Sequence, residues 1–333
     1  MKRRGILFLI MLMIFTFSVS GCTGEVQEPA TEQVGKEVSS EEETGDRLSV
    51  VATLFPQYDF ARRLGGDRVE VRYLLPAGTE AHSYEPTPQD MVALLNADVF
   101  LYTGEFMEPW TRNIVENLKE EDVLVVDLSQ GIPLLTSEDH DHDHDHDHGE
   151  EDDHKEGIDP HYWTDPNMAI LMVQSISDAL SQVDPENEEA YISEEIELID
   201  ELAKLDGDIR EALSRTKSRT ILSGGHFAFG YFAREYGLEH MSPYSGFSPN
   251  AEPTPQRITA LIRTIEETGA NAIYHEELID PKVAQVIVDE TGVRLLLLHG
   301  AHNISKEDLE SGKTYMEIMY DNLENLKEGL GYE

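Results

Sequence analysis

The segment Leu48-Ser-Val-Val-Ala-Thr-Leu54 is followed at once by Phe55-Pro56. A short run of apolar and β-branched residues without regular polar alternation is typical of a strand that is buried on both faces of a sheet. The Phe-Pro pair ends this strand, and a helical pattern then continues to Leu64. The segment therefore predicts the first strand and the first helix of a parallel α/β sheet.

The same alternation continues along the chain to Asp127. Strands are predicted over Val69–Leu75, Val99–Tyr102 and Val123–Asp127, and helices over Pro88–Leu95 and Trp110–Leu118. Strands that alternate with helices predict a parallel sheet with helices on both of its faces.

A second run of this kind follows later in the chain. Strands are predicted over Arg219–Ser223, Ala272–Tyr274 and Arg294–Leu298, and a helix over Ala228–Tyr236. Two amphipathic helices, Asn167–Ser181 and Pro185–Ser214, lie between the two runs. The second is about 45 Å long at 1.5 Å per residue, which is enough to span two lobes. The predicted fold class is therefore α/β with two similar lobes, each a parallel sheet flanked by helices. The expected boundaries are 47–183 for the first lobe, 184–216 for the linking helix and 217–333 for the second lobe.

The N-terminus has the pattern of an export signal. Three basic residues at 2–4 precede an apolar run, Ile6–Phe17, and the small residues that end at Cys22. A retained membrane anchor is the weaker interpretation, because a spanning helix needs about 20 apolar residues. Residues 1–21 are thus a predicted signal peptide.

Cys22 is the single cysteine of the chain, so an intramolecular disulfide is excluded. The string Val19-Ser-Gly-Cys22 resembles the lipobox of bacterial lipoproteins, which implies that Cys22 is lipidated. Residues 22–46 are rich in Glu, Ser, Thr and Gly and poor in large apolar residues. Such a segment buries too little surface to fold, and we expect a disordered tether.

The charge of the chain excludes some classes of partner. It has 66 acidic and 25 basic residues and a formal net charge of -41. Nucleic-acid binding needs a basic footprint, and attraction to anionic lipid needs a polybasic segment. We therefore expect neither a nucleic-acid partner nor electrostatic membrane binding.

Six of the thirteen histidines lie in one acidic segment, residues 138–156. They are His140, His142, His144, His146, His148 and His154. This segment consists almost entirely of Asp, Glu and His, so no core forms there and a solvated loop is expected.

Four other histidines stand where parallel sheets place their ligand sites. His82, His226 and His299 each follow a predicted strand, and His161 lies between two Asp-Pro turns before a helix. The carboxyl ends of parallel strands border the ligand crevice in such folds, and neutral imidazole suits zinc and its transition-metal neighbours. These positions favour one shared metal site, with ordinary surface or core histidines as the alternative.

Four motifs give the chain a family resemblance. They are Gly78-Thr-Glu-Ala-His-Ser-Tyr-Glu-Pro-Thr-Pro88, Asp159-Pro-His-Tyr-Trp-Thr-Asp-Pro166, Gly225-His-Phe-Ala-Phe-Gly-Tyr-Phe-Ala-Arg-Glu-Tyr-Gly237 and Thr314-Tyr-Met-Glu-Ile-Met-Tyr-Asp-Asn-Leu323. In this order they resemble the zinc/manganese solute-binding lipoproteins of bacterial ABC importers. The resemblance covers nearly everything from residue 48 onward, and it implies two α/β lobes joined by a rigid helix, with the metal between them.

The resemblance also implies a set of metal ligands. His82, His161 and His226 correspond to the family's histidine ligands, whereas the fourth ligand varies between a carboxylate and water. This sequence places His299 where a carboxylate from the second lobe is often found, so His299 is the expected fourth ligand. The alternatives are Glu80, Glu276 and His302.

Zn²⁺ is the expected cargo. His226 replaces the glutamate of some manganese members, and imidazole-rich sites favour zinc over manganese. The acidic loop is similar to the auxiliary loop of zinc-uptake members, which supports the same choice. Mn²⁺ or another divalent ion is the alternative.

The implied function is that of an extracytoplasmic, lipid-anchored and monomeric subunit of an ABC importer. Such a subunit carries out no catalysis; it captures Zn²⁺ and delivers it to a membrane permease that an ATPase drives. Two alternatives belong to other classes. One is a zinc hydrolase with Glu80 or Glu276 as its general base, and the other is a surface adhesin.

Overall fold

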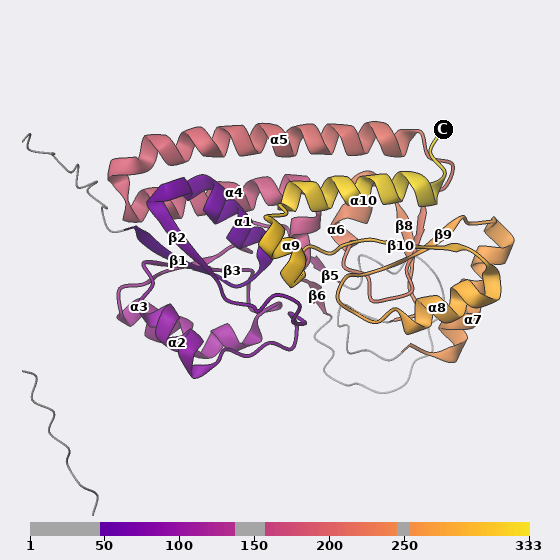
Figure 1. The fold of residues 1–333 in the computed structure, drawn as a ribbon, viewed down its shortest axis with the longest axis horizontal. Helices are drawn as coiled ribbons and strands as arrows, with labels where there is room; N and C mark the ends of the chain where they lie inside the picture. The colour runs from indigo at the N-terminus through magenta and orange to yellow at the C-terminus, as the bar shows by residue number, and fades with distance from the viewer. Residues whose placement is uncertain (1–46, 137–156, 245–252) are drawn as a thin grey trace, which may run out of the picture. The chain divides into compact units, whose positions relative to one another are not determined.

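The computed structural model describes residues 47–136, 157–244 and 253–333 (Figure 1). The predicted signal peptide, Cys22, the tether 22–46 and the six histidines of the acidic loop lie outside these residues. Within the described ranges, no helix combines the length and the apolar character that crossing a membrane requires.

The first lobe is built on a four-stranded parallel sheet with the order β2-β1-β3-β4. Its strands are β1 (Leu48–Ala52), β2 (Val69–Tyr73), β3 (Val99–Tyr102) and β4 (Leu124–Asp127). Every residue of β3 is buried, as expected for a central strand covered on both faces. The four apolar runs predicted as strands therefore form the parallel sheet of the first lobe.

Helices cover both faces of this sheet, with α1 and α4 on one side and α2 and α3 on the other (Figure 1). Their bounds are α1 (Phe55–Gly65), α2 (Pro88–Leu95), α3 (Val115–Glu120) and α4 (Pro166–Val183). The Thr87 hydroxyl caps α2 by accepting from the backbone N–H of Asp90. The helix predicted over Trp110–Leu118 is in fact a 3₁₀ segment, η2 (Pro109–Asn113), followed by α3.

The second lobe repeats the strand order of the first. Strands β7 (Thr220–Leu222) and β8 (Glu239–Met241) pair in parallel, as do β9 (Ala272–His275) and β10 (Arg294–Leu297). A parallel bridge between Ser223 and Tyr274 places β7 next to β9. The resulting order, β8-β7-β9-β10, corresponds to β2-β1-β3-β4 of the first lobe. The lobes are thus similar in topology as well as in class.

Five helices of the described residues accompany the second sheet. They are α6 (Gly230–Tyr236), α7 (Pro255–Thr268), α8 (Lys282–Thr291), α9 (Lys306–Ser311) and α10 (Tyr315–Leu330). Only α6 falls in a helix that the sequence analysis predicted.

The longest helix of the described ranges, α5 (Glu188–Ser214), connects the lobes and lies along both α4 and α10 (Figure 1). The 3₁₀ turn η5 (Pro185–Asn187) precedes it, so the observed helix begins three residues after the predicted start at Pro185. A short antiparallel pair, β5 (Leu135–Thr136) and β6 (Ile158–Asp159), stands on either side of residues 137–156, and the 3₁₀ turn η4 (Tyr162–Thr164) leads from β6 to α4.

One hydrophobic core extends through both lobes. Its buried side chains include Leu64 of α1, Leu202 of α5, Phe232 of α6 and Leu326 of α10. Two smaller clusters cover the far faces of the two sheets, around Phe100 and around Ile273. The predicted α/β fold with two lobes and one long helix is confirmed.

Candidate metal centre

His82 lies in the loop between β2 and α2, and the carboxylate of Glu80 shapes this loop. Glu80 accepts hydrogen bonds from the backbone N–H groups of His82, at 2.7 Å, and Ser83, at 2.8 Å. It also accepts one from the Ser83 hydroxyl at 2.7 Å. The Glu80 carboxylate therefore binds its own loop and directs the His82 ring inward.

His161 follows β6 and is completely buried. Its Nδ1 lies 2.7 Å from Oδ1 of Asp159, and the same oxygen accepts the His161 backbone N–H at 2.9 Å. Its Nε2 lies 3.1 Å from Nε2 of His82. The carboxylate of Asp159 thus fixes the ring so that Nε2 faces His82.

His226 follows β7 through Gly224 and Gly225. Its Nδ1 lies 2.5 Å from Oε2 of Glu276. Glu276 comes directly after β9, the strand next to β7. A Cβ atom at Gly225 would lie 2.9 Å from Oε1 of Glu276, so glycine is needed for this close approach. The buried Nε2 of His226 has no hydrogen-bond partner among the described residues.

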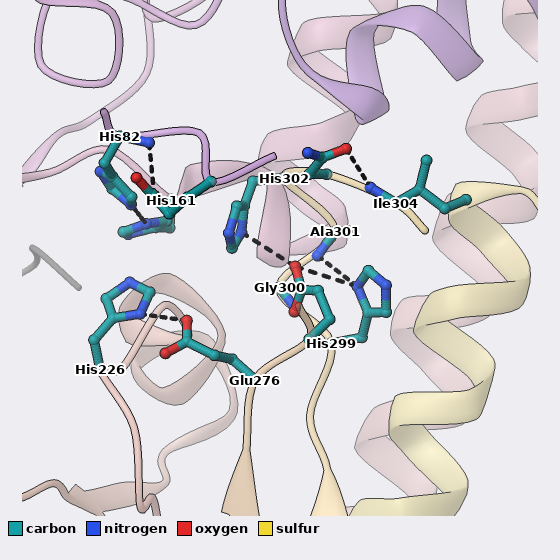
Figure 2. Close-up of polar contacts among 12 residues, drawn as sticks. His82, His161, His226, Glu276, His299, Gly300, Ala301, His302 and Ile304 are labelled. Carbon is teal, nitrogen blue, oxygen red and sulfur yellow. Dashed lines mark hydrogen bonds and ion pairs between the residues drawn. The ribbon is translucent and has the colours of Figure 1, made fainter. Parts of the chain in front are cut away.

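The structure brings these three histidines together (Figure 2). Ligand nitrogens of His82, His161 and His226 all lie within 4.8 Å of one another. The ring centroids are 5.0 to 5.6 Å apart. Imidazole nitrogens that converge in this way form a ligand set suited to a borderline-soft cation such as Zn²⁺.

His302 faces the same cluster. Its ring centroid lies 6.1 Å from His82, 6.2 Å from His161 and 6.5 Å from His226. Its Nδ1 lies 3.4 Å from Oε1 of the buried Glu277. His302 thus has a carboxylate on the side away from the cluster, as His161 and His226 do.

His299 is not brought into the cluster, and its ring turns toward α10 (Figure 2). Its Nδ1 accepts a hydrogen bond from the backbone N–H of Ala301 at 3.0 Å, and its backbone is held by Asn322. Ala301 has a left-handed φ of 59°, so the chain reverses between residues 299 and 302. This reversal presents His302 to the cluster in place of His299.

The carboxylate candidates and the two other described histidines have other contacts. Glu276 is engaged with His226, and Glu80 is engaged with its own loop. His275 contacts the backbone carbonyl of Glu276 through Nδ1, and His240 stacks on Phe227 at 4.0 Å between ring centroids.

Burial sets the charge of the cluster. Burial lowers the pKa of both His82 and His161 well below the usual value, so both rings are neutral and able to bind a cation. Burial also raises the pKa of Asp159 to about 7. Burial lowers the pKa of His226 too, but its hydrogen bond to Glu276 and nearby carboxylates outweigh this and leave the pKa raised.

Sequence analysis missed the carboxylates that support the rings. Asp159 stands two residues before His161 in a quoted motif, and Glu277 follows Glu276 directly after a strand. Metal-binding histidines usually donate their second nitrogen to a carboxylate or carbonyl. For Asp159 the signal was its place within the His161 motif; for Glu277 it was only its place directly after a strand.

Comparison with known proteins agrees with this geometry. The sequence profile of the family described as zinc-uptake complex component A, periplasmic, matches residues 50–329. The high-affinity zinc uptake system protein ZnuA of Bacillus subtilis is 34% identical over 291 residues, which are 87% of this chain and 90% of that protein.

Two further similarities involve a longer streptococcal protein. The zinc-binding lipoprotein AdcA of Streptococcus pneumoniae is 34% identical over 290 residues, which are 87% of this chain but only 57% of AdcA. The Zn(II)-bound ZnuA-like domain of that AdcA superposes with a TM-score of 0.71 and 31% identity, over 85% of this chain and 99% of the domain. The similarity therefore covers one domain of AdcA and not the whole protein.

Proposed function

The chain belongs to the zinc-uptake complex component A family, and from this premise we propose that it captures Zn²⁺ outside the cytoplasm and delivers it to the permease of an ABC importer. The observation that carries the proposal is the convergence of His82, His161 and His226. The neutral rings of His82 and His161 and the unpartnered Nε2 of His226 offer nitrogen ligands without requiring any rearrangement of the lobes.

The proposed ligand set is His82, His161, His226 and His302. Zinc prefers tetrahedral coordination by nitrogen and sulfur ligands, and four imidazoles meet that preference. His302 is favoured over His299 because its ring lies within 6.5 Å of the three others, measured between centroids. His299 uses its Nδ1 to accept from Ala301 and faces α10.

A hydrolase is not supported. Family members are components of metal uptake and not enzymes. The two general-base candidates are also engaged, since Glu80 binds its own loop and Glu276 binds His226. Neither of these two carboxylates is therefore free to deprotonate a zinc-bound water.

The location and the partners follow from the same family. A zinc importer component works with a permease and its ATPase. We infer that residues 1–21 direct export, that lipid on Cys22 anchors a monomer through the tether 22–46, and that the two lobes 47–183 and 217–333 are joined by the helix within 184–216. The name lipoprotein borne by AdcA supports the anchor. Metabolic labelling with a radioactive fatty acid tests it, since the variant C22A should incorporate none.

Metal binding by single variants tests the ligand set. His82→Ala and His302→Ala should lower zinc affinity about 100-fold or more and change the visible spectrum of bound Co²⁺, since each removes a ligand. His299→Ala is the matched control and should keep the spectrum of the unchanged protein. An altered spectrum in His299→Ala with an unaltered one in His302→Ala would assign the fourth ligand to His299 instead.

The acidic loop has a separate proposed role. The six histidines of 138–156 collect zinc loosely and pass it to the buried site, a proposal that rests on their composition. Deletion of residues 138–154 should slow zinc uptake when zinc is scarce and leave uptake at high zinc unchanged. If the deletion variant took up zinc as fast as the unchanged protein when zinc is scarce, this role would be contradicted.

A further inference from the structure

Asn303 belongs to the second lobe but binds the first. It follows His302 after β10, and it has no exposed surface. Its Oδ1 accepts a hydrogen bond from the Tyr73 hydroxyl at 2.7 Å. Its Nδ2 donates to the backbone carbonyl of Pro76, at 3.1 Å, and to that of Thr79.

Every hydrogen-bonding position of this amide is occupied. An asparagine side chain has two N–H donors and an oxygen with two lone pairs. The fourth partner is the backbone N–H of Ile304, which donates to Oδ1 at 2.6 Å. A buried polar group with all of its partners present strengthens the local structure, whereas one that loses a partner weakens it.

The backbone around Asn303 makes similar contacts. The N–H of Gly78 donates to the carbonyl of Ile304 at 2.9 Å, and the N–H of Phe55 donates to that of His302 at 3.3 Å. The indole of Trp163 donates to the carbonyl of Gly300 at 2.7 Å. We call residues 300–304 the docked segment, because its hydrogen bonds are made largely with the first lobe.

The docked segment carries His302, and the loop that it binds, residues 76–82, carries His82. The two rings lie 6.1 Å apart between centroids, on backbones from different lobes. A Zn²⁺ ion bound by both His82 and His302 must lose one of these two ligands first when it leaves the site. A ligand that stays close rebinds before the others release, because its effective concentration at the ion is high.

We propose that Asn303 is a positioning residue, which holds the His82 loop against the docked segment and so determines how slowly zinc leaves the site. The inference rests on the proposed function, because it takes His82 and His302 as zinc ligands. Asn303 itself does not touch the ion. Its effect should therefore appear in the rate of zinc release, with the set of ligands unchanged.

The variant Asn303→Asp tests the proposal. The carboxylate keeps the shape and can accept from Tyr73, but its second oxygen opposes the carbonyls of Pro76 and Thr79 in place of a donor. Loss of these bonds should accelerate release of Zn²⁺ into excess chelator by about tenfold or more. The visible spectrum of bound Co²⁺ should stay the same, because all four histidines remain.

Asn325→Asp is the matched control. The Asn325 amide donates to the carbonyl of Leu297 at 2.9 Å, entirely within the second lobe. The same chemical change there should lower the melting temperature but leave the zinc release rate unaltered. Equal release rates in the Asn303 variant, the Asn325 variant and the unchanged protein would overturn the proposal.

Two further measurements complete the test. If Asn303→Asp does not fold, Tyr73→Phe removes one hydrogen bond and retains the ring that stacks on Tyr58, 5.2 Å away between centroids. Release should then accelerate about fivefold, and an unchanged rate would overturn the proposal. If the unchanged protein binds no zinc, the proposed function itself fails, which is a distinct outcome.

Discussion

Nδ1 of His302 lies 3.4 Å from Oε1 of Glu277, and neither atom has a hydrogen-bond partner in the described part of the chain; Nδ1 of His299 lies 3.5 Å from the same oxygen. The other carboxylate oxygen of Glu277 accepts from the backbone N–H of Gly300 at 2.7 Å. A small movement of the ring closes the remaining distance. Glu277 is therefore placed to support His302 as Asp159 supports His161, although it makes no hydrogen bond to His302 here.

Replacing Glu277 by glutamine should lower zinc affinity by about 10- to 100-fold, the usual effect of losing the partner behind a metal-binding histidine. Glutamine has the same shape but no charge, and it cannot accept from both His302 and Gly300. Competition with a chromogenic chelator measures the change. The exposed Glu324, which pairs with Lys327, provides the control in Glu324→Gln. Equal affinities in the two variants would contradict a supporting role for Glu277.

Zinc binding should release more protons at pH 6 than at pH 8. Burial raises the pKa of Asp159 to about 7, so the empty site holds a proton there at pH 6, and a bound cation favours the ionised form. The raised pKa of His226 acts in the same direction, because a ligand ring must lose its proton. At pH 8 the Asp159 proton is already gone. Affinity should accordingly fall as the pH is lowered.

Calorimetry in two buffers of different ionisation enthalpy counts these protons. Asp159→Asn should reduce the number released at pH 6 and leave the number at pH 8 nearly unchanged. The same count at both pH values in the unchanged protein would show that neither group changes its protonation.

Gly300→Ala should damage the site more than the fold. A Cβ atom at residue 300 would lie 2.7 Å from Nδ1 of His302, so the imidazole must move. We expect at least about tenfold weaker zinc binding, since a displaced ligand loses its geometry. Gly207→Ala is the control, because a Cβ there meets no atom within 4 Å inside α5. That change should add about 0.5–1 kcal/mol of stability without changing zinc affinity.

Asp59→Ala should destabilise the fold. The buried Asp59 of α1 accepts the backbone N–H of Tyr315, at 2.9 Å, in the first turn of α10. Without the carboxylate this buried donor has no partner, which costs about 1–3 kcal/mol. Urea denaturation of the metal-free protein measures the loss. Asp67→Ala, at an exposed position, should stay within about 0.5 kcal/mol of the unchanged protein.

Much of the fold could be predicted from local patterns. The helix Pro88–Leu95 and the strand Val99–Tyr102 have the predicted bounds, because Pro at the helix start and a continuous apolar run are local signals. Helix α7 was not predicted, although Thr254-Pro255 is a clear start signal of the same type.

The site was harder to predict where it depends on tertiary structure. His82, His161 and His226 follow strands or turns, and the structure brings them together. The choice between His299 and His302 depends on the left-handed φ of Ala301, a residue with no sequence preference for that conformation. The contacts of Asn303 join residues more than 220 positions apart, which no local pattern reveals.

The common core limits how this protein can admit an ion. Rotating one lobe away from the other would expose side chains such as Leu202 and Phe232, at a cost of about 25 cal/mol per Å². The core therefore opposes such a rotation and keeps the two lobes at a nearly constant separation, so we expect exchange to proceed by movement of the loops that carry the histidines. A fixed separation of the lobes favours cations whose radius and preferred geometry match it. Part of the discrimination between metals is thus already established when the chain folds, before any metal is encountered.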